Sequence, residues 1–171
     1  AIEEPISIAF LKRYAADINL KKGTEAYRPA VAEDTGKCVA VIGGGPGGLT
    51  AASILRRKGH AVTVFDAMPE MGGMLRYGIP EYRLPKSVLD AEITLLRSMG
   101  IEMRPSSRIG GENGIQLSDL KKEYDAVIVA IGAWTSSKMR IPGEDLCGVL
   151  GGIDFLRKIA MGEAISIGRR G

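Results

Sequence analysis

The segment Val39–Gly48, which reads VAVIGGGPGG, constrains the fold most because it joins an apolar run directly to a glycine-rich turn. Its glycines 43, 45 and 48 form a G-x-G-x-x-G frame. In such a frame the first glycine permits a tight turn, the second lets phosphate oxygens approach the backbone, and the third lets the next helix pack close to the strand. A helix beginning near Pro46 would direct its free N–H groups at a phosphate. The motif therefore predicts a site for the pyrophosphate of a dinucleotide.

The residues around this turn complete a βαβ unit. Cys38–Ile42 is apolar throughout, as expected of a parallel strand buried on both faces. A helix with apolar residues at helical spacing follows the turn and stops at Gly59. A second strand is predicted over Ala61–Phe65, and Asp66 follows it, where a carboxylate can accept hydrogen bonds from the ribose hydroxyls of an adenosine. The alternative is a βαβ unit whose turn is purely structural.

The rest of the chain continues this pattern of strands and helices. Together the segments predict an α/β fold, a Rossmann-like domain with a parallel sheet and flanking helices over residues 37–171, preceded by a helical arm and linker over residues 1–36. The expected elements are an arm helix over about Ser7–Ile18 with Ser7 as N-cap, a helix from Pro85 to Gly100, short strands over Ile101–Arg104 and Ser107–Ile109, a helix over Leu117–Tyr124, an apolar strand within Asp125–Gly132 and a last helix over Gly152–Met161.

The stretch Asp66–Pro85, DAMPEMGGMLRYGIPEYRLP, resembles the FAD-binding region of the glutamate synthase small (β) subunit family. Related proteins are the flavin domain of dihydropyrimidine dehydrogenase and subunits of NADH-dependent ferredoxin:NADP oxidoreductase and sulfide dehydrogenase. Residues 3–13, Ile141–Leu146 and Asp154–Leu156 are also similar to these proteins. The resemblance thus extends over nearly the whole chain.

The resemblance implies FAD as the cofactor and assigns a role to each matching residue. Two of these residues have alternatives: Arg83 suits a phosphate or flavin edge as a planar cation but could be a solvated surface arginine, and Ile109 could belong to the core. At Ala130-Ile131-Gly132 the family usually has Ala-Thr-Gly, so a threonine hydrogen bond is in doubt while the backbone course survives. The implied contacts are Gly43, Gly44, Gly45, Pro46 and Gly47 to the pyrophosphate, Asp66 to the ribose, Gly72, Gly73, Met74, Arg83 and Ile109 along the site, and Gly132 where the chain turns past the cofactor.

Composition favours a soluble cytoplasmic domain. The net charge of +3 is too small and too dispersed to indicate a nucleic-acid partner, and no apolar stretch approaches membrane-spanning length. Cys38 and Cys147 are too far apart for an iron–sulfur site; Cys38 is expected in the core, and the single histidine, His60, in a turn. Trp134 could cover a cofactor, although loop packing is the favoured interpretation. The sequence shows no nucleophile–base set and no metal-ligand spacing, so neither catalytic side chains nor metal ligands are predicted.

The number of glycine turns limits what the chain can do alone. FAD and a nicotinamide cofactor each require a pyrophosphate turn, and the sequence contains one, at Gly43–Gly48. We therefore expect a fragment of a larger flavoprotein that is inactive alone. NAD(P)H and iron–sulfur clusters would be bound elsewhere, on a remaining NAD(P)-binding segment or subunit and on an iron–sulfur or large catalytic subunit. The alternatives are a non-catalytic flavin-binding or assembly module and an NAD-binding dehydrogenase domain, the latter disfavoured by Gly72-Gly73.

Overall fold

The computed structural model of the protein describes residues 6–165 and divides the chain into two compact units, residues 1–30 and 31–171. The first unit contains α1 (Ile8–Lys21) and a 3-10 turn, η1 (Gly23–Glu25). Helix α1 confirms the predicted helical arm, but Ser7 forms no side-chain hydrogen bond as its cap. No residue of α1 is buried, and its apolar side chains Ile8, Leu11 and Ile18 are exposed.

The second unit is built on a four-stranded sheet with the order β3-β2-β1-β4. Its strands are β1 (Cys38–Ile42), β2 (Ala61–Phe65), β3 (Glu102–Arg104) and β4 (Ala126–Val129), and every neighbouring pair is parallel. The last residue of β1, Ile42, is level with the last residues of both β2 and β4. The strands therefore end together at one edge of the sheet, which is where ligands bind in open α/β sheets.

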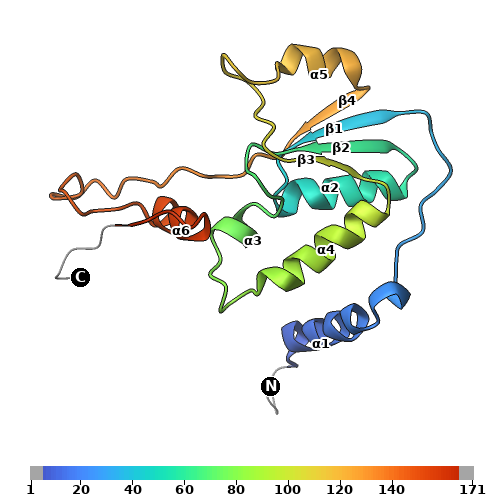
Figure 1. The fold of residues 1–171 in the computed structure, drawn as a ribbon, viewed down its shortest axis with the longest axis horizontal. Helices are drawn as coiled ribbons and strands as arrows, with labels where there is room; N and C mark the ends of the chain where they lie inside the picture. Colours follow the sequence, from blue (N-terminus) through green and yellow to red (C-terminus); the bar gives the residue numbers. More distant parts are fainter. Residues whose placement is uncertain (1–5, 166–171) are drawn as a thin grey trace. The chain divides into compact units, whose positions relative to one another are not determined.

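Helices cover both faces of this sheet, as Figure 1 shows. Helices α2 (Pro46–Arg57) and α4 (Lys86–Ser98) lie on one face, and α5 (Leu117–Glu123) lies on the other. A short helix, α3 (Met74–Tyr77), follows the carboxyl end of β2 and contacts α6 (Gly152–Ala160). This arrangement confirms the predicted α/β fold, while α3 and η1 were not expected from the sequence.

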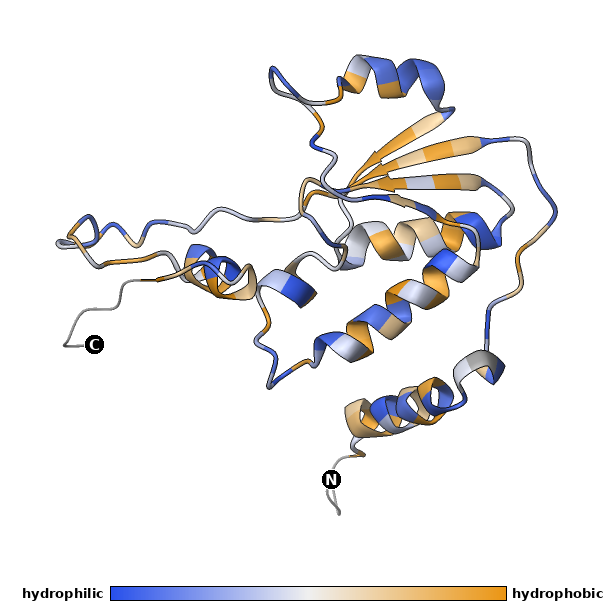
Figure 2. Cartoon of the chain, in the orientation of Figure 1, coloured by the Kyte–Doolittle hydropathy of each residue, from blue (hydrophilic) through white to orange (hydrophobic). Residues whose placement is uncertain are grey.

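The core forms two layers because successive strand residues point to opposite faces of the sheet. Figure 2 shows β1, β2 and β4 as the most apolar part of the unit. Val41, Val62 and Val64 pack with residues of α2 and α4, whereas Ala40, Ile42 and Phe65 pack with Leu120 of α5. Burial on both faces explains why β1 is a continuous apolar run and why β2 is interrupted only by the buried Thr63.

The structure corrects two expectations outside the central strands. The predicted strand over Ser107–Ile109 is wrong: Ser107 donates its N–H to the Asp66 carbonyl over 2.7 Å, and only an isolated bridge joins Ile109 to Ile115. Ser107 thus bonds to the residue after β2, and the next two residues pair with Ile115, instead of extending the sheet. Cys38 is half-buried instead of fully in the core, because its thiol donates to the Asp125 carboxylate over 3.4 Å at the amino end of the sheet.

Within residues 6–165, no helix combines the length and the apolar character needed to cross a bilayer.

Candidate dinucleotide-binding site

The glycine turn leaves β1 through a backbone conformation that other residues rarely adopt. Gly43 has a φ of +112° and donates its N–H to the Phe65 carbonyl over 2.7 Å. A Cβ at Gly43 would lie 2.3 Å from the Ala130 carbonyl oxygen, which follows β4. The conformation and the close approach of β4 both require glycine here. The turn therefore passes directly over the carboxyl edge of the sheet.

Helix α2 begins close to this turn and leaves its first N–H groups uncapped by side chains. A Cβ at Gly48 would lie 1.8 Å from the Gly43 carbonyl oxygen, so this glycine allows the helix to pack against the strand. Gly45 is the N-cap and Pro46 the first helical residue, and no side chain caps the helix. A Cβ at Gly47 would meet no atom within 4 Å. Uncapped N–H groups beside open space are suited to an anion.

Asp66 ties the glycine turn to the segment after β2. Its carboxylate accepts hydrogen bonds from the N–H of Gly44 over 2.6 Å and from the N–H of Met68 over 2.7 Å, and the residue is 8% exposed. Each carboxylate oxygen has a second lone pair, so acceptance from a ribose hydroxyl remains chemically possible. In the structure itself, the visible role of Asp66 is to hold the backbone of the turn.

A second glycine segment, Gly72–Gly73, lies directly against the first. Gly72 donates its N–H to the Gly44 carbonyl over 2.8 Å. A Cβ at Gly73 would lie 2.6 Å from the Cα of Gly45, and Gly73 has a φ of +53°. Two backbones can approach this closely only without side chains between them. The structure thus brings together the residues 43–47, Asp66 and Gly72–Gly73, with Met74 opening α3 next to them.

The remaining predicted residues do not contact the two glycine segments as closely. Ile109 is half-buried against Ile42 and Phe65, next to the ends of β1 and β2. Gly132 is exposed after β4 with a φ of +68°. Arg83 is exposed in the turn before α4, and within residues 6–165 its guanidinium forms no hydrogen bond or ion pair. The role of each of these residues at a cofactor stays a prediction.

Trp134 packs in the loop after β4, which is the role that the sequence favoured for it. Its indole N–H donates to the Ile131 carbonyl over 3.0 Å, and its ring lies 5.9 Å from that of Tyr77. Among the described residues, no group of three or more histidine, cysteine, aspartate or glutamate side chains could hold a metal ion.

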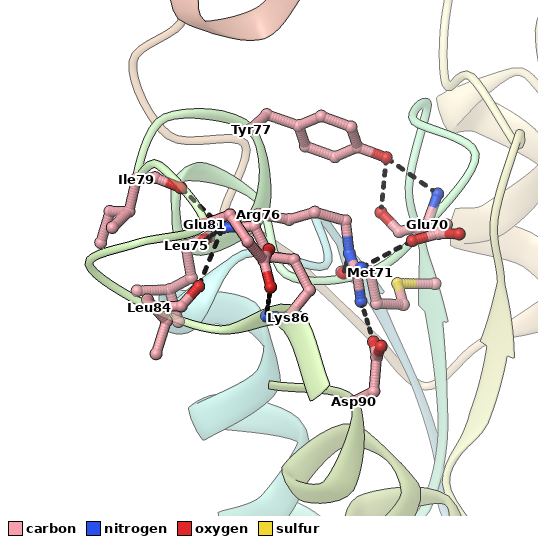
Figure 3. Close-up of polar contacts among 10 residues, drawn as sticks. All are labelled: Glu70, Met71, Leu75, Arg76, Tyr77, Ile79, Glu81, Leu84, Lys86 and Asp90. Carbon is pink, nitrogen blue, oxygen red and sulfur yellow. Dashed lines mark hydrogen bonds and ion pairs between the residues drawn. The ribbon is translucent and has the colours of Figure 1, made fainter. Parts of the chain in front are cut away.

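Sequence reasoning missed the polar network that surrounds the second glycine segment (Figure 3). Arg76 is 9% exposed, and its guanidinium contacts the Met71 carbonyl and the carboxylates of Glu70 and Asp90. Tyr77 accepts from the Glu70 N–H over 3.0 Å and donates to the Glu70 carbonyl over 3.2 Å. Burial raises the pKa of the Tyr77 hydroxyl. Most of these residues lie within residues 70–77, but their spacing follows no pattern that predicts contacts between them, so nothing in the sequence singled them out.

Lys86 holds the turn that follows α3. Its ammonium donates to the carbonyls of Leu75, Ile79 and Leu84, over 2.9, 2.6 and 3.4 Å respectively. This turn and α6 line an open pocket of about 810 Å³. The pocket is mainly apolar, with lining residues that include Tyr77, Ile79, Tyr82, Phe155, Leu156 and Ile159.

Known proteins resemble this chain in sequence. A family model described as pyridine nucleotide-disulphide oxidoreductase matches residues 37–167. The chain is 37% identical over 188 residues to the β subunit of NADP(+)-dependent formate dehydrogenase of Moorella thermoacetica, covering 97% of the chain and 26% of that protein. It is 40% identical over 154 residues to the glutamate synthase [NADPH] small chain of Mycobacterium tuberculosis, covering 90% of the chain and 31% of that protein.

A solved structure shows the same fold. FprA of Mycobacterium tuberculosis in complex with NADPH superposes with a TM-score of 0.63 and 28% identity, covering 71% of this chain and 28% of that one. The similarity to glutamate synthase small chains confirms the resemblance seen in the sequence. The chain spans no more than about a third of the length of these relatives.

Proposed function

Because the chain belongs to the pyridine nucleotide-disulphide oxidoreductase family, we propose that it is the FAD-binding part of an NAD(P)H-dependent oxidoreductase resembling the glutamate synthase small subunit. One observation carries the proposal. Two glycine segments, distant in the sequence, meet through their backbones at the carboxyl edge of the sheet, beside the uncapped start of α2. Such an edge is the position at which Rossmann-type folds hold a dinucleotide.

The residues present fit an extended dinucleotide. The N–H groups at the start of α2 would bind the pyrophosphate, since the positive end of the helix dipole favours an anion and open space lies at Gly47. Asp66 would accept from the adenosine ribose while keeping its bond to Gly44. The segment from Gly72 to Met74 would border the cofactor farther along. Arg83, Ile109 and Gly132 complete the proposed site.

The protein contributes binding and orientation. FAD would supply the redox chemistry, exchanging hydride with a nicotinamide and passing electrons onward. Around it, the glycine backbones would approach the phosphates, the α2 N-terminus would offset their charge and the buried Asp66 would orient the ribose. We propose that NAD(P)H and iron–sulfur clusters are bound by other segments or subunits of a cytoplasmic assembly. These would be an NAD(P)-binding segment and an iron–sulfur or large catalytic subunit.

Titration of the purified, flavin-free chain with FAD tests the proposal. We expect saturable quenching of flavin fluorescence at one FAD per chain, with NAD competing only weakly. The weak competition would separate the proposal from the alternative of an NAD-binding dehydrogenase domain. If FAD fluorescence stays that of free flavin at micromolar concentrations of the chain, the proposal fails.

A second measurement concerns turnover. The sequence contains one G-x-G-x-x-G turn, which FAD would occupy, so we expect no nicotinamide site of this kind in the chain. Anaerobic mixing of the chain, FAD and excess NADPH or NADH should bleach the flavin no faster than in free solution. Rapid, saturable bleaching would show that these residues bind the nicotinamide as well.

A further inference from the structure

We propose that Arg76 is a positioning residue for this site, which holds the second glycine segment against the first without touching the cofactor. The inference rests on the proposed function, because it concerns the dinucleotide for which the two segments form the site. It deepens that function by naming the side chain that sets the distance between the segments.

Each nitrogen of the Arg76 guanidinium contacts a protein group. Its Nε donates to the Met71 carbonyl over 2.7 Å, one terminal nitrogen lies 2.7 Å from the Glu70 carboxylate, and the other contacts the Asp90 carboxylate. Figure 3 shows these three contacts diverging from one side chain. A guanidinium that is 9% exposed is stable only when it is paired in this way. Arg76 also lines the pocket beside α3, but its three contacts are all to protein groups that flank the second glycine segment.

The contacts converge on the peptide that precedes the second glycine segment. Met71, whose carbonyl Arg76 binds, is 2% exposed and comes immediately before Gly72. Gly72 in turn donates to the Gly44 carbonyl. Tyr77 fixes both backbone groups of Glu70 from the next position of α3. A shift of the Arg76 side chain would thus move the Met71 carbonyl and, through Gly72, the hydrogen bond to Gly44 in the glycine turn.

We call Arg76 and its contacts with Glu70, Met71 and Asp90 the clamp. Asp90 connects the clamp to α4. It lies on α4 next to Leu89, which is buried against the sheet, and a Cβ at Gly72 would lie 2.8 Å from the Leu89 side chain. The ion pair between Arg76 and Asp90 therefore fixes the position of the second glycine segment relative to α4, which is packed against the sheet. Removal of Arg76 would leave the Glu70 and Asp90 carboxylates without their shared cation and the Met71 carbonyl without its donor.

The test combines FAD affinity with the absorption spectrum of the bound flavin. In Arg76→Met we expect FAD to bind about tenfold more weakly, because a small displacement of the groups that position a ligand lowers its affinity markedly. The visible spectrum of the bound flavin should move toward that of free flavin. Arg76→Lys keeps the charge but cannot reach three acceptors, so its affinity should lie between those of Arg76→Met and wild type. The matched control is Arg13→Met, which removes an exposed arginine paired with Asp17, and it should bind FAD as wild type does.

Variants at the exposed partners keep the test decisive if Arg76→Met does not fold. Asp90→Asn and Glu70→Gln change side chains that are 56% and 62% exposed, so the fold should persist. We expect FAD to bind about threefold more weakly to Asp90→Asn, since one of three contacts is weakened. Wild-type affinity and an unchanged flavin spectrum in folded Arg76→Met, or in Asp90→Asn if Arg76→Met does not fold, would overturn the inference.

Amide hydrogen exchange of the ligand-free chain separates this inference from the proposed function. Weakening the contact between Arg76 and Asp90 should speed exchange at the Gly72 amide in Asp90→Asn while leaving the β1 amides unchanged. If wild type binds no FAD, the proposed function fails, and the exchange data still decide whether the clamp exists. Equal exchange at Gly72 in wild type and Asp90→Asn would show that it does not.

Discussion

The two glycine segments reach the same place by different physical means. The first, Gly43–Gly48, is shaped by the backbone: a positive φ, a close approach to Ala130 and a helix start that packs on the turn itself. The second, Gly72–Gly73, also has positive φ angles and packs against Gly45, but side chains, chiefly Arg76 and Tyr77, bind the residues just before it. The comparison teaches that close backbone packing chiefly shapes the first segment, whereas the second depends in addition on a network of side chains.

The difference predicts different sensitivities. Changes in the first segment should act through steric clashes, which depend little on pH or on distant residues. Changes around the second should act through hydrogen bonds and charges, which depend on partners elsewhere in the chain. The following four variants test this division, from the largest expected effect to the smallest.

The largest effect is expected at Gly48. In Gly48→Ala a methyl group would lie 1.8 Å from the Gly43 carbonyl oxygen, so α2 must move away from β1. We expect the free energy of unfolding to fall by about 3 kcal/mol in urea denaturation, the upper range for overpacking. Gly47→Ala in the same helix meets no atom within 4 Å and serves as the control. Equal stability of the two variants would contradict a steric origin for the turn.

The next effect concerns binding instead of folding. A Cβ at Gly45 would have its nearest neighbour, the Cα of Gly73, at 3.7 Å, which is ordinary contact. Gly45→Val should therefore fold with a stability within about 1 kcal/mol of wild type but lose FAD affinity by at least about 100-fold, because its side chain fills the space of the pyrophosphate. Fluorescence titration and circular dichroism measure the two quantities. A folded variant with wild-type flavin content would place the pyrophosphate elsewhere.

Asp66 lies between the two segments and should show both kinds of effect. Asp66→Ala removes the acceptor of the Gly44 and Met68 N–H groups as well as the proposed ribose contact. We expect FAD binding to weaken by about 1–3 kcal/mol, the usual range for hydrogen bonds to a charged group. Asp66→Asn, which keeps the shape and one acceptor, should lose less. FAD affinity equal to wild type in a titration of Asp66→Ala would refute the assignment.

The smallest effect is a pH dependence confined to the second segment. Burial raises the pKa of Tyr77 in the folded state. The neutral hydroxyl therefore contributes fully to the free energy of unfolding below the pKa of the unfolded state, and this contribution is lost as pH rises through the higher pKa of the folded state. Tyr77→Phe should cost about 1 kcal/mol at neutral pH, and the difference from wild type should shrink above about pH 10. Chemical denaturation at several pH values measures this. If the difference in unfolding free energy between wild type and Tyr77→Phe stayed constant up to pH 11, a neutral, buried hydroxyl would be contradicted. The effect of Gly48→Ala on unfolding free energy should not depend on pH.

Much of the fold could be predicted because its signals are local. The apolar runs of β1 and β2 and the glycine frame between them lie within one continuous segment, and the strands have the predicted bounds. The prediction failed at residues 107–109, where hydrogen bonds to the loop after β2 replace strand pairing. Strand pairing depends on distant partners, and three residues carry too little pattern to reveal them.

By itself, the sequence determined that β1 must be followed by a tight glycine turn and an uncapped helix, because φ above zero and close backbone packing are properties of glycine at single positions. It also determined the candidate cofactor residues of that turn. Only the tertiary structure decided how the second glycine segment is held. Arg76 contacts Glu70, Met71 and Asp90, and no local spacing specifies such a set. The physical reason is that buried charges require partners, and those partners become neighbours only when α3 and α4 have packed beside the sheet.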